Sequence, residues 1–244
     1  LILIFKMKKI IITGGSGRFG SVLKQNPFFK NCYYPNKKKL NILNIKSIEK
    51  YLSLKKPKIL IHLAALSRPM NIHDKKISNS IDLNIIGTSN IVKVCYRMKI
   101  KLIYFSTNYV YPGTKGNYTE ESPLLPINNY AWSKLGGECA VKLYKNSLIL
   151  RVCMAEKPFI HKKAFGDFKT NFIFHEGVAK ILKKLLNKKG IINLGGPTKT
   201  VFNFAKKYNP NVKKISARKK LGKNFPLNPY MNLKKLDKIV LKKS

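Results

Sequence analysis

The chain has 244 residues, of which 44% are hydrophobic, so it can bury a sizeable core and is not an intrinsically disordered protein. Its formal net charge is +39, from 49 Lys and Arg against 10 Asp and Glu. Only five of these basic residues are Arg, and the lysines are spread along the chain and not gathered on one helix, which argues against a nucleic-acid-binding protein. No apolar run reaches the roughly 20 residues of a membrane-spanning helix, so the sequence does not predict a membrane protein.

The first strand begins near the start of the chain, and we therefore expect Met7 to be the true start and residues 1–6 to be an upstream extension. The four cysteines, at positions 32, 95, 139 and 153, form no C-x-x-C and no Cys/His cluster with metal spacing. This usage predicts reduced thiols, a cytoplasmic location and no metal site.

Strand and helix patterns alternate through the first 152 residues. Apolar β-rich runs predict strands at 10–13, 31–35, 58–65, 101–106 and 147–152. Helical periods predict helices at 18–25, 47–56 (with Ser47 as a cap), 80–98 and 130–145. The packing residues expected in the third of these helices are Ile81, Ile85, Ile91, Val92 and Val94. This alternation predicts an α/β fold with a Rossmann-like, doubly wound parallel sheet.

The pattern changes after Val152, where about 20 residues show no clear period. A helix at 175–187, a short strand at 190–196, a helix at 198–207 and a basic helix at 232–243 follow. We therefore expect a dinucleotide-binding domain at 7–155 and a small C-terminal substrate lobe at 156–244, with part of this lobe returning to the sheet.

The segment "TGGSGRFG", residues 13–20, follows the first strand and opens a helix. Its glycines permit a tight turn and a close backbone approach to a pyrophosphate, next to the positive end of a helix dipole. The cofactor contacts expected here are Gly14, Gly17, Arg18, Phe19 and Gly20. No acidic residue follows the second strand before Glu49, while Lys37–Lys39 do, which favours NADP(H) over NAD(H).

Hydroxyl groups follow the fourth strand, where Ser106 and Thr107 come at the carboxyl edge that binds ligands in such sheets. Tyr130 and Lys134 are one turn apart on the next helix and share a face. An ammonium near a phenol favours the phenolate, which brings a tyrosine closer to useful acid–base chemistry. The coincidence of these features with the glycine turn predicts a proton-transfer site.

These segments together resemble the extended short-chain dehydrogenase/reductases. The matching segments, in order, are "TGGSGRFG", "HLAA" (62–65), "LNIIGTSNI" (83–91), "STNYVY" (106–111), "YAWSK" (130–134) and "LILRV" (148–152). Within that family the chain is most similar to the dTDP-4-dehydrorhamnose reductase group. The resemblance covers residues 7–155, and "INLGGPTKTVFNFAKK" (192–207) is similar to the family's C-terminal lobe.

The resemblance implies a role for each matching residue. Tyr130 would donate a proton to the substrate oxygen, Lys134 would lower the Tyr130 pKa and bind the nicotinamide ribose, and Thr107 would orient the carbonyl. Asn84 would anchor a proton-relay water or cap a helix turn. Ala64 and Ala65 would line the cofactor groove.

The resemblance also implies a function, namely an NAD(P)H-dependent reductase of a keto group on a nucleotide-activated deoxysugar, with a homodimer left open. Two alternatives remain, an NAD-dependent sugar-nucleotide epimerase and a non-catalytic, cofactor-binding regulatory protein. The non-catalytic alternative arises because the part that would bind substrate is short. Only about 24 residues separate Arg151 from the helix at 175, roughly half the length usual in the group. Asn41, Asn44 and Asn108 also stand where the group usually carries acids.

Overall fold

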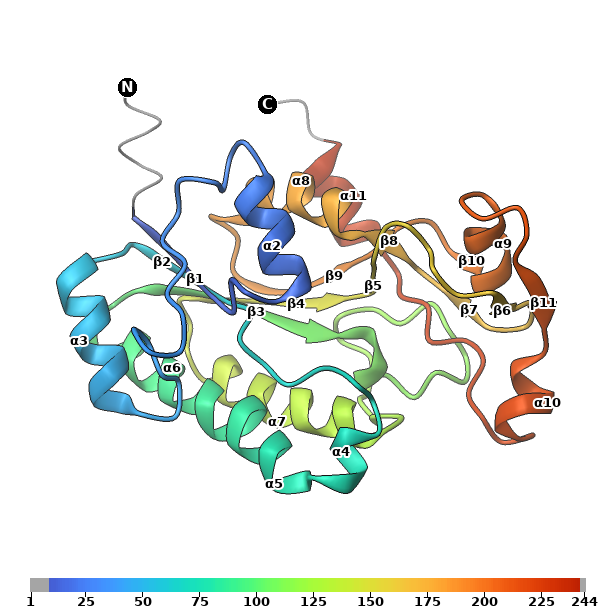
Figure 1. Cartoon of the computed structure of the whole chain (residues 1–244), viewed down its shortest axis with the longest axis horizontal. Coiled ribbons are helices and arrows are strands. Elements are labelled where there is room, and N and C mark those ends of the chain that lie inside the picture. The colour runs from blue at the N-terminus through green and yellow to red at the C-terminus, as the bar shows by residue number, and fades with distance from the viewer. Residues whose placement is uncertain (1–8, 242–244) are drawn as a thin grey trace.

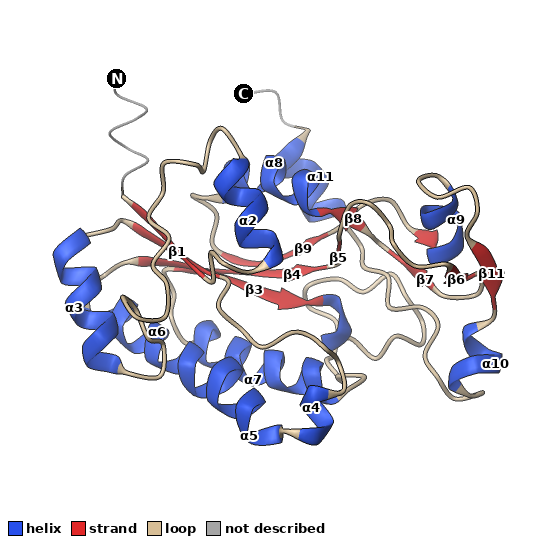
Figure 2. Ribbon diagram, viewed as in Figure 1, coloured by secondary structure: helices blue, strands red, loops and turns tan. Residues whose placement is uncertain are grey.

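A computed structural model describes residues 9–241, so the expected start at Met7 lies outside the described residues. Figures 1 and 2 show a central sheet covered by helices on both faces. The sheet has five parallel strands in the order β1-β2-β3-β4-β9. Their bounds are Ile10–Thr13, Ile59–His62, Lys101–Thr107, Ser147–Val152 and Gly190–Leu194. The predicted α/β fold with a parallel sheet is therefore confirmed.

Two layers of helices cover the sheet (Figure 2). One layer holds α2, α8 and α11, with bounds Arg18–Gln25, His175–Leu185 and Lys234–Val240. The other holds α3, α6 and α7, with bounds Ile45–Lys55, Gly87–Arg97 and Asn129–Lys142. Each layer buries its own apolar cluster against the sheet. None of the helices in the described part of the chain is long and apolar enough to cross a bilayer.

The strand expected at 31–35 is wrong, because the structure has only a single bridge between Tyr33 and Ile11 there. Tyr33 N donates to Ile10 O at 3.0 Å, and Ile12 N donates to Tyr33 O at 2.9 Å. Pro35 cannot donate to a ladder, which stops the pairing two residues later. The chain nevertheless flanks β1 on both sides, with Tyr33 on one and β2 on the other. The order of the segments along the sheet therefore reverses at β1, and in parallel sheets such a point has a crevice at the carboxyl end of the strand.

The single helix expected at 80–98 is divided. Short helices α4 (Ile72–Lys75) and α5 (Ile77–Ser80) lead into a π-helix, η1 (Ile81–Ile86), and then into α6. A π turn holds more residues than an α turn, so the apolar face rotates across it. Ile81 is 42% exposed for this reason, whereas Ile91 and Val94 are fully buried, as predicted.

The cap of α3 also differs from expectation. The helix begins at Ile45, and the side chain of Asn44 accepts a hydrogen bond from Ser47 N at 3.0 Å. Asn44, not Ser47, is therefore the N-cap. An amide oxygen performs here the capping that an acid would perform, so the Asn at this position does not weaken the helix start.

Beyond β4 the chain leaves the sheet and later returns to it. Short strands pair in three two-stranded sheets, β5–β8, β6–β11 and β7–β10. In the first sheet β5 is Met154–Ala155 and β8 is Ile173–Phe174. In the second β6 is Lys163–Phe165 and β11 is Lys213–Ile215, and in the third β7 is Lys169–Thr170 and β10 is Lys199–Thr200. Helices α9 (Val201–Lys206) and α10 (Ala217–Leu221) complete this part, which lies at the right in Figure 1 and has its own apolar cluster. The elements α8, β9 and α11 return to the main sheet.

Candidate active site

The glycine turn after β1 has the geometry of a phosphate cradle. Gly14 has φ +72°, and a Cβ on it would lie 2.6 Å from Ala64 N. A Cβ on Gly20 would lie 2.5 Å from Gly14 O. Only glycine fits these two positions, because one backbone segment passes directly against another. Gly17 is the N-cap of α2 and supplies no side-chain cap, so the first N–H groups of the helix remain available to a ligand.

A buried histidine fixes this turn to the sheet. His62 is 1% exposed, and its Nδ1 lies 2.8 Å from Thr13 Oγ1 while its Nε2 lies 3.2 Å from Thr88 Oγ1. Burial, followed by the charge of Lys134, lowers the His62 pKa to about 3. The imidazole is therefore neutral at physiological pH and acts as a hydrogen-bonded part of the core.

The three expected catalytic side chains line one cavity of about 290 Å³. Thr107 ends β3 and is 5% exposed, while its Oγ1 accepts a hydrogen bond from Tyr109 N at 3.3 Å. Tyr130 and Lys134 lie in the first turns of α7, which the Asn128 side chain caps by accepting from Ala131 N at 2.8 Å. This arrangement places two hydroxyl groups and an ammonium around one space.

Burial controls the ionisation of this pair. It lowers the Lys134 pKa to about 7, against an opposing effect of Glu138. It also raises the Tyr130 pKa to about 12, although Arg68 and Arg18 act to lower it. Desolvation thus outweighs the two arginine charges at Tyr130, and the effect of Lys134 on the acidity of the Tyr130 phenol stays a prediction. The Tyr130 phenol is consequently protonated at neutral pH.

A second histidine, His73 of α4, packs against the ring of Tyr130. Its ring centroid lies 5.1 Å from that of Tyr130, and its Nδ1 lies 2.8 Å from Ser80 Oγ. The side chain is 1% exposed, and burial lowers its pKa. Periodic patterns along the chain carry no signal for this contact, because His73 and Tyr130 are more than 50 residues apart.

Most of the expected cofactor residues also line this cavity, namely Gly14, Gly17, Arg18, Phe19, Gly20 and Ala65. Ala64 and Asn84 are not among its lining residues. The Asn84 side chain is fully engaged elsewhere, since it accepts from Leu66 N at 2.8 Å and donates to Leu66 O at 2.9 Å and Ser133 Oγ at 2.8 Å. Asn84 thus fixes the loop after β2 to α7. Its role as the anchor of a proton-relay water stays a prediction.

A buried ion pair anchors the other end of α7. Arg151 of β4 donates to Glu138 at 2.6 Å, and both side chains are 3% exposed. Arg151 also donates to Tyr111 OH at 2.8 Å, and this hydroxyl donates to Asn193 Oδ1 at 2.7 Å. The neighbouring Glu120 is also buried, and it accepts a hydrogen bond from Asn193 N at 2.9 Å.

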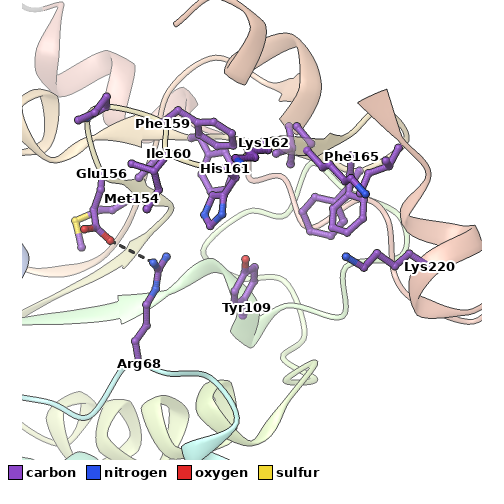
Figure 3. A pocket seen from close by; sticks show the side chains of 18 of the residues that line it. Arg68, Tyr109, Met154, Glu156, Phe159, Ile160, His161, Lys162, Phe165 and Lys220 are labelled. Atoms are coloured by element: carbon purple, nitrogen blue, oxygen red, sulfur yellow. Dashed lines mark hydrogen bonds and ion pairs between the residues drawn. The ribbon is translucent and has the colours of Figure 1, made fainter. Parts of the chain in front are cut away.

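A larger cavity of about 580 Å³ adjoins the first and lies between the sheet and the C-terminal part of the chain (Figure 3). Arg68, Tyr109 and Glu156 line both cavities. Several aromatic side chains form its walls, among them Phe159, Phe165, Phe168, Phe172 and Phe225. The short stretch between Arg151 and His175 therefore still encloses a ligand-sized space. Within residues 9–241, no three or more His, Cys, Asp or Glu side chains are grouped to hold a metal.

The parallel sheet, the glycine turn at its crevice and the Tyr130–Lys134 helix define an extended short-chain dehydrogenase/reductase fold. The family model described as the RmlD substrate binding domain matches residues 7–157, and this chain belongs to that family.

Among curated proteins, methionine adenosyltransferase 2 subunit beta of Xenopus laevis is 32% identical over 155 residues, which cover 59% of this chain and 46% of that protein. The dTDP-4-dehydrorhamnose reductase of Aggregatibacter actinomycetemcomitans is 25% identical over 202 residues, 79% of this chain and 63% of that protein. The chain thus spans about half the length of the first of these relatives.

Among solved structures, dTDP-4-dehydrorhamnose reductase from Bacillus anthracis in complex with NADP superimposes with a TM-score of 0.81 at 26% identity. The superposition covers 93% of this chain and 91% of that one. The expected likeness to this reductase group is therefore confirmed.

Proposed function

We propose that this chain is an NAD(P)H-dependent reductase of a keto group on a nucleotide-activated deoxysugar, similar to dTDP-4-dehydrorhamnose reductase. The observation that carries the proposal is that Thr107, Tyr130, Lys134 and the glycine turn line one cavity. The likeness to the Bacillus anthracis reductase, whose structure contains NADP, supports the same activity and cofactor class.

The residues of the cleft fit a dinucleotide. The Gly14–Gly20 turn would hold the pyrophosphate against the uncapped start of α2, and Lys134 would bind the nicotinamide ribose. When bound, the reduced nicotinamide supplies a hydride to the substrate carbonyl carbon. The exposed Lys37–Lys39 turn beside Tyr33 favours a cofactor with the additional phosphate, so we propose NADPH as the preferred form.

The proton chemistry follows from this chain's own side chains. The Thr107 hydroxyl would hydrogen-bond to the substrate carbonyl and orient it. Tyr130 would give its phenolic proton to the same oxygen as negative charge develops there. Lys134 would stabilise the resulting phenolate, because its ammonium lies one helical turn away and would pair with the new negative charge.

We propose the boundary between domains near residue 155, with residues 156–244 as the substrate lobe. The aromatic cavity of about 580 Å³ would take the nucleotide sugar from that side. The four cysteines are free thiols, which supports a reducing, cytoplasmic location. Whether two copies associate would be measured by light scattering of the purified protein.

The direct test is oxidation of NADPH and NADH, followed by absorbance, with a panel of 4-keto-deoxysugar nucleotides. Net consumption of reduced cofactor supports the reductase. A changed sugar configuration without net consumption would instead identify an epimerase.

A second function is favoured by the Xenopus laevis relative, whose name describes a subunit of methionine adenosyltransferase 2. By that analogy the chain would be a cofactor-binding subunit of a larger enzyme. Tight binding of NADPH without turnover of any substrate in the panel would support this function and contradict the reductase.

A further inference from the structure

The short helix α4 lies against the first turn of α7, as Figure 1 shows. Two neighbouring pairs of side chains make this contact. Asn129 Nδ2 donates to Asp74 Oδ1 at 2.8 Å in an exposed hydrogen bond. The rings of His73 and Tyr130 pack together with an angle of 56° between their planes. The contact therefore reaches the side chain that would supply the proton in the proposed reaction.

The direction of the Tyr130 phenol depends on packing. Within residues 9–241 the hydroxyl group makes no hydrogen bond with another protein group, and Ser133 bonds only to the Tyr130 backbone oxygen. The side chain lines the smaller cavity, so part of it borders open space. Among the aromatic pairs of the described residues, Tyr130 pairs only with His73. The imidazole therefore provides the aromatic surface against which the phenol ring is held.

His73 is itself fixed from further directions. Its Nδ1 lies 2.8 Å from Ser80 Oγ of α5, and the two side chains are 1% and 3% exposed. The Ser67 backbone and Asp74 lie close enough to raise the His73 pKa, although burial outweighs them and lowers it. Ser67 lines the smaller cavity, as Tyr130 does. One imidazole thus joins α5, the cavity wall after β2 and the Tyr130 ring.

The filling of space does not by itself explain an imidazole at this position. His73 Nε2 is buried and makes no hydrogen bond of acceptable geometry with the described residues, and a buried polar atom without a partner lowers stability. A phenylalanine would fill similar space without this cost. It would lack the hydrogen bond to Ser80, which fixes the orientation of the imidazole ring. The residue type therefore favours a ring held in one orientation over a ring that only fills space.

We infer that His73 is a positioning residue for Tyr130, and that Ser80 holds the imidazole in the orientation that supports the phenol. The inference deepens the proposed function and rests on it, because the direction of the phenol affects turnover only if Tyr130 gives its proton to a substrate. His73 lines neither cavity, so it acts through Tyr130 and not on the substrate. A reacting group displaced by about 1 Å can lose about 10²-fold in rate.

Steady-state kinetics with the best keto-sugar nucleotide of the panel test this role. His73→Ala should lower kcat by about tenfold, while the KM for the substrate and the Kd for NADPH stay within about twofold. Ser80→Ala and His73→Phe, which each keep a ring beside Tyr130, should lower kcat by about threefold. In a Tyr130→Phe background, His73→Ala should cause no further loss, because the residue through which it acts has already lost its proton.

The matched control is Asp74→Ala, which removes the other contact between α4 and α7 and should leave kcat within about twofold. An unchanged kcat in His73→Ala, or an equal loss in Asp74→Ala, would overturn the inference. A loss of NADPH affinity in step with kcat would show a general structural role and would overturn it as well. Should His73→Ala fail to fold, Ser80→Ala and His73→Phe provide the same comparison with Asp74→Ala.

Nuclear magnetic resonance tests the position of the ring without any turnover. In protein labelled with ¹³Cε-tyrosine, Tyr130→Phe identifies the Tyr130 signal among those of the 12 tyrosines. Ser80→Ala leaves His73 in place but releases its imidazole, so it should shift or broaden this signal, whereas Asp74→Ala should not. An unmoved signal in Ser80→Ala would overturn the inference. A signal that moves as described, in a protein that reduces no keto-sugar nucleotide, would refute only the proposed function.

Discussion

The Tyr104 hydroxyl donates a hydrogen bond to the backbone oxygen of Lys134 at 2.9 Å, and the Lys134 ammonium lies 4.2 Å from the centroid of the same ring. One side chain in the middle of β3 therefore contacts both the backbone and the charge of the lysine. Because Thr107 ends the same strand, β3 sets the relative positions of Thr107 and the Tyr130–Lys134 turn.

Substitution at Tyr104 separates the two contacts. Tyr104→Phe removes the hydrogen bond and keeps the ring under the ammonium, so we expect a loss of about 1 kcal/mol in the free energy of unfolding, measured in urea. Tyr104→Leu also removes the ring and should cost about 3 kcal/mol, together with a lower turnover. A larger loss in Tyr104→Phe than in Tyr104→Leu would contradict this order.

Tyr130 supplies the proton in the proposed reaction. Tyr130→Phe keeps the ring that packs against His73, so the fold and cofactor affinity should be retained. Turnover should fall by about 10²-fold or more, which is the scale of a lost general acid. Steady-state kinetics with the best substrate of the panel would measure this, and undiminished turnover would refute the assigned role.

The buried Lys134 predicts a pH dependence of stability. Its pKa falls from 10.5 to about 7 on folding, so the unfolded chain binds more protons between these values. Stability must therefore increase with pH over this window and be lost as pH falls towards 7. We expect a gain of about 2 kcal/mol between about pH 7 and about pH 9 in the wild type relative to Lys134→Met. Parallel urea titrations of both proteins at several pH values test this, and equal slopes would show that the ammonium is not desolvated.

The pair Glu138–Arg151 anchors α7 to β4. Glu138→Gln leaves the buried Arg151 charge without its counter-charge, which should lower the free energy of unfolding by about 3 kcal/mol. The exposed pair Glu49–Arg97 provides the comparison, since Glu49→Gln should cost less than about 1 kcal/mol. Similar losses in the two variants would show that burial of the pair has no special importance.

The exposed turn at Lys37–Lys39 should determine the choice of cofactor. Replacing all three lysines with Ala should raise the Kd for NADPH by about tenfold and leave the Kd for NADH within about twofold. The loss should diminish at high salt, because exposed charges are screened. Fluorescence titration of both cofactors gives the comparison, and equal losses for both would indicate a general effect of charge.

Local patterns predicted much of the architecture and of the site. The buried apolar runs at 10–13 and 147–152 form strands with those bounds, and the helix at 18–25 begins and ends as expected. The glycine spacing and the one-turn spacing of Tyr130 and Lys134 are local features, so they could be interpreted without a partner segment. The sequence was less informative at residues 31–35, where a single bridge replaces a strand, and at 81–86, where a π turn rotates the apolar face.

By itself, the sequence determined where the turn glycines, the strands and the one-turn Tyr130–Lys134 spacing lie, because these features depend only on neighbours in the chain. Only the tertiary structure decided the environment of those residues. The raised Tyr130 pKa comes from burial, His73 reaches it from a separate helix, and Glu156 bridges Arg18 and Arg68 across 138 and 88 residues. Desolvation and charge pairing depend on which segments the fold brings together, and no local pattern encodes those distances.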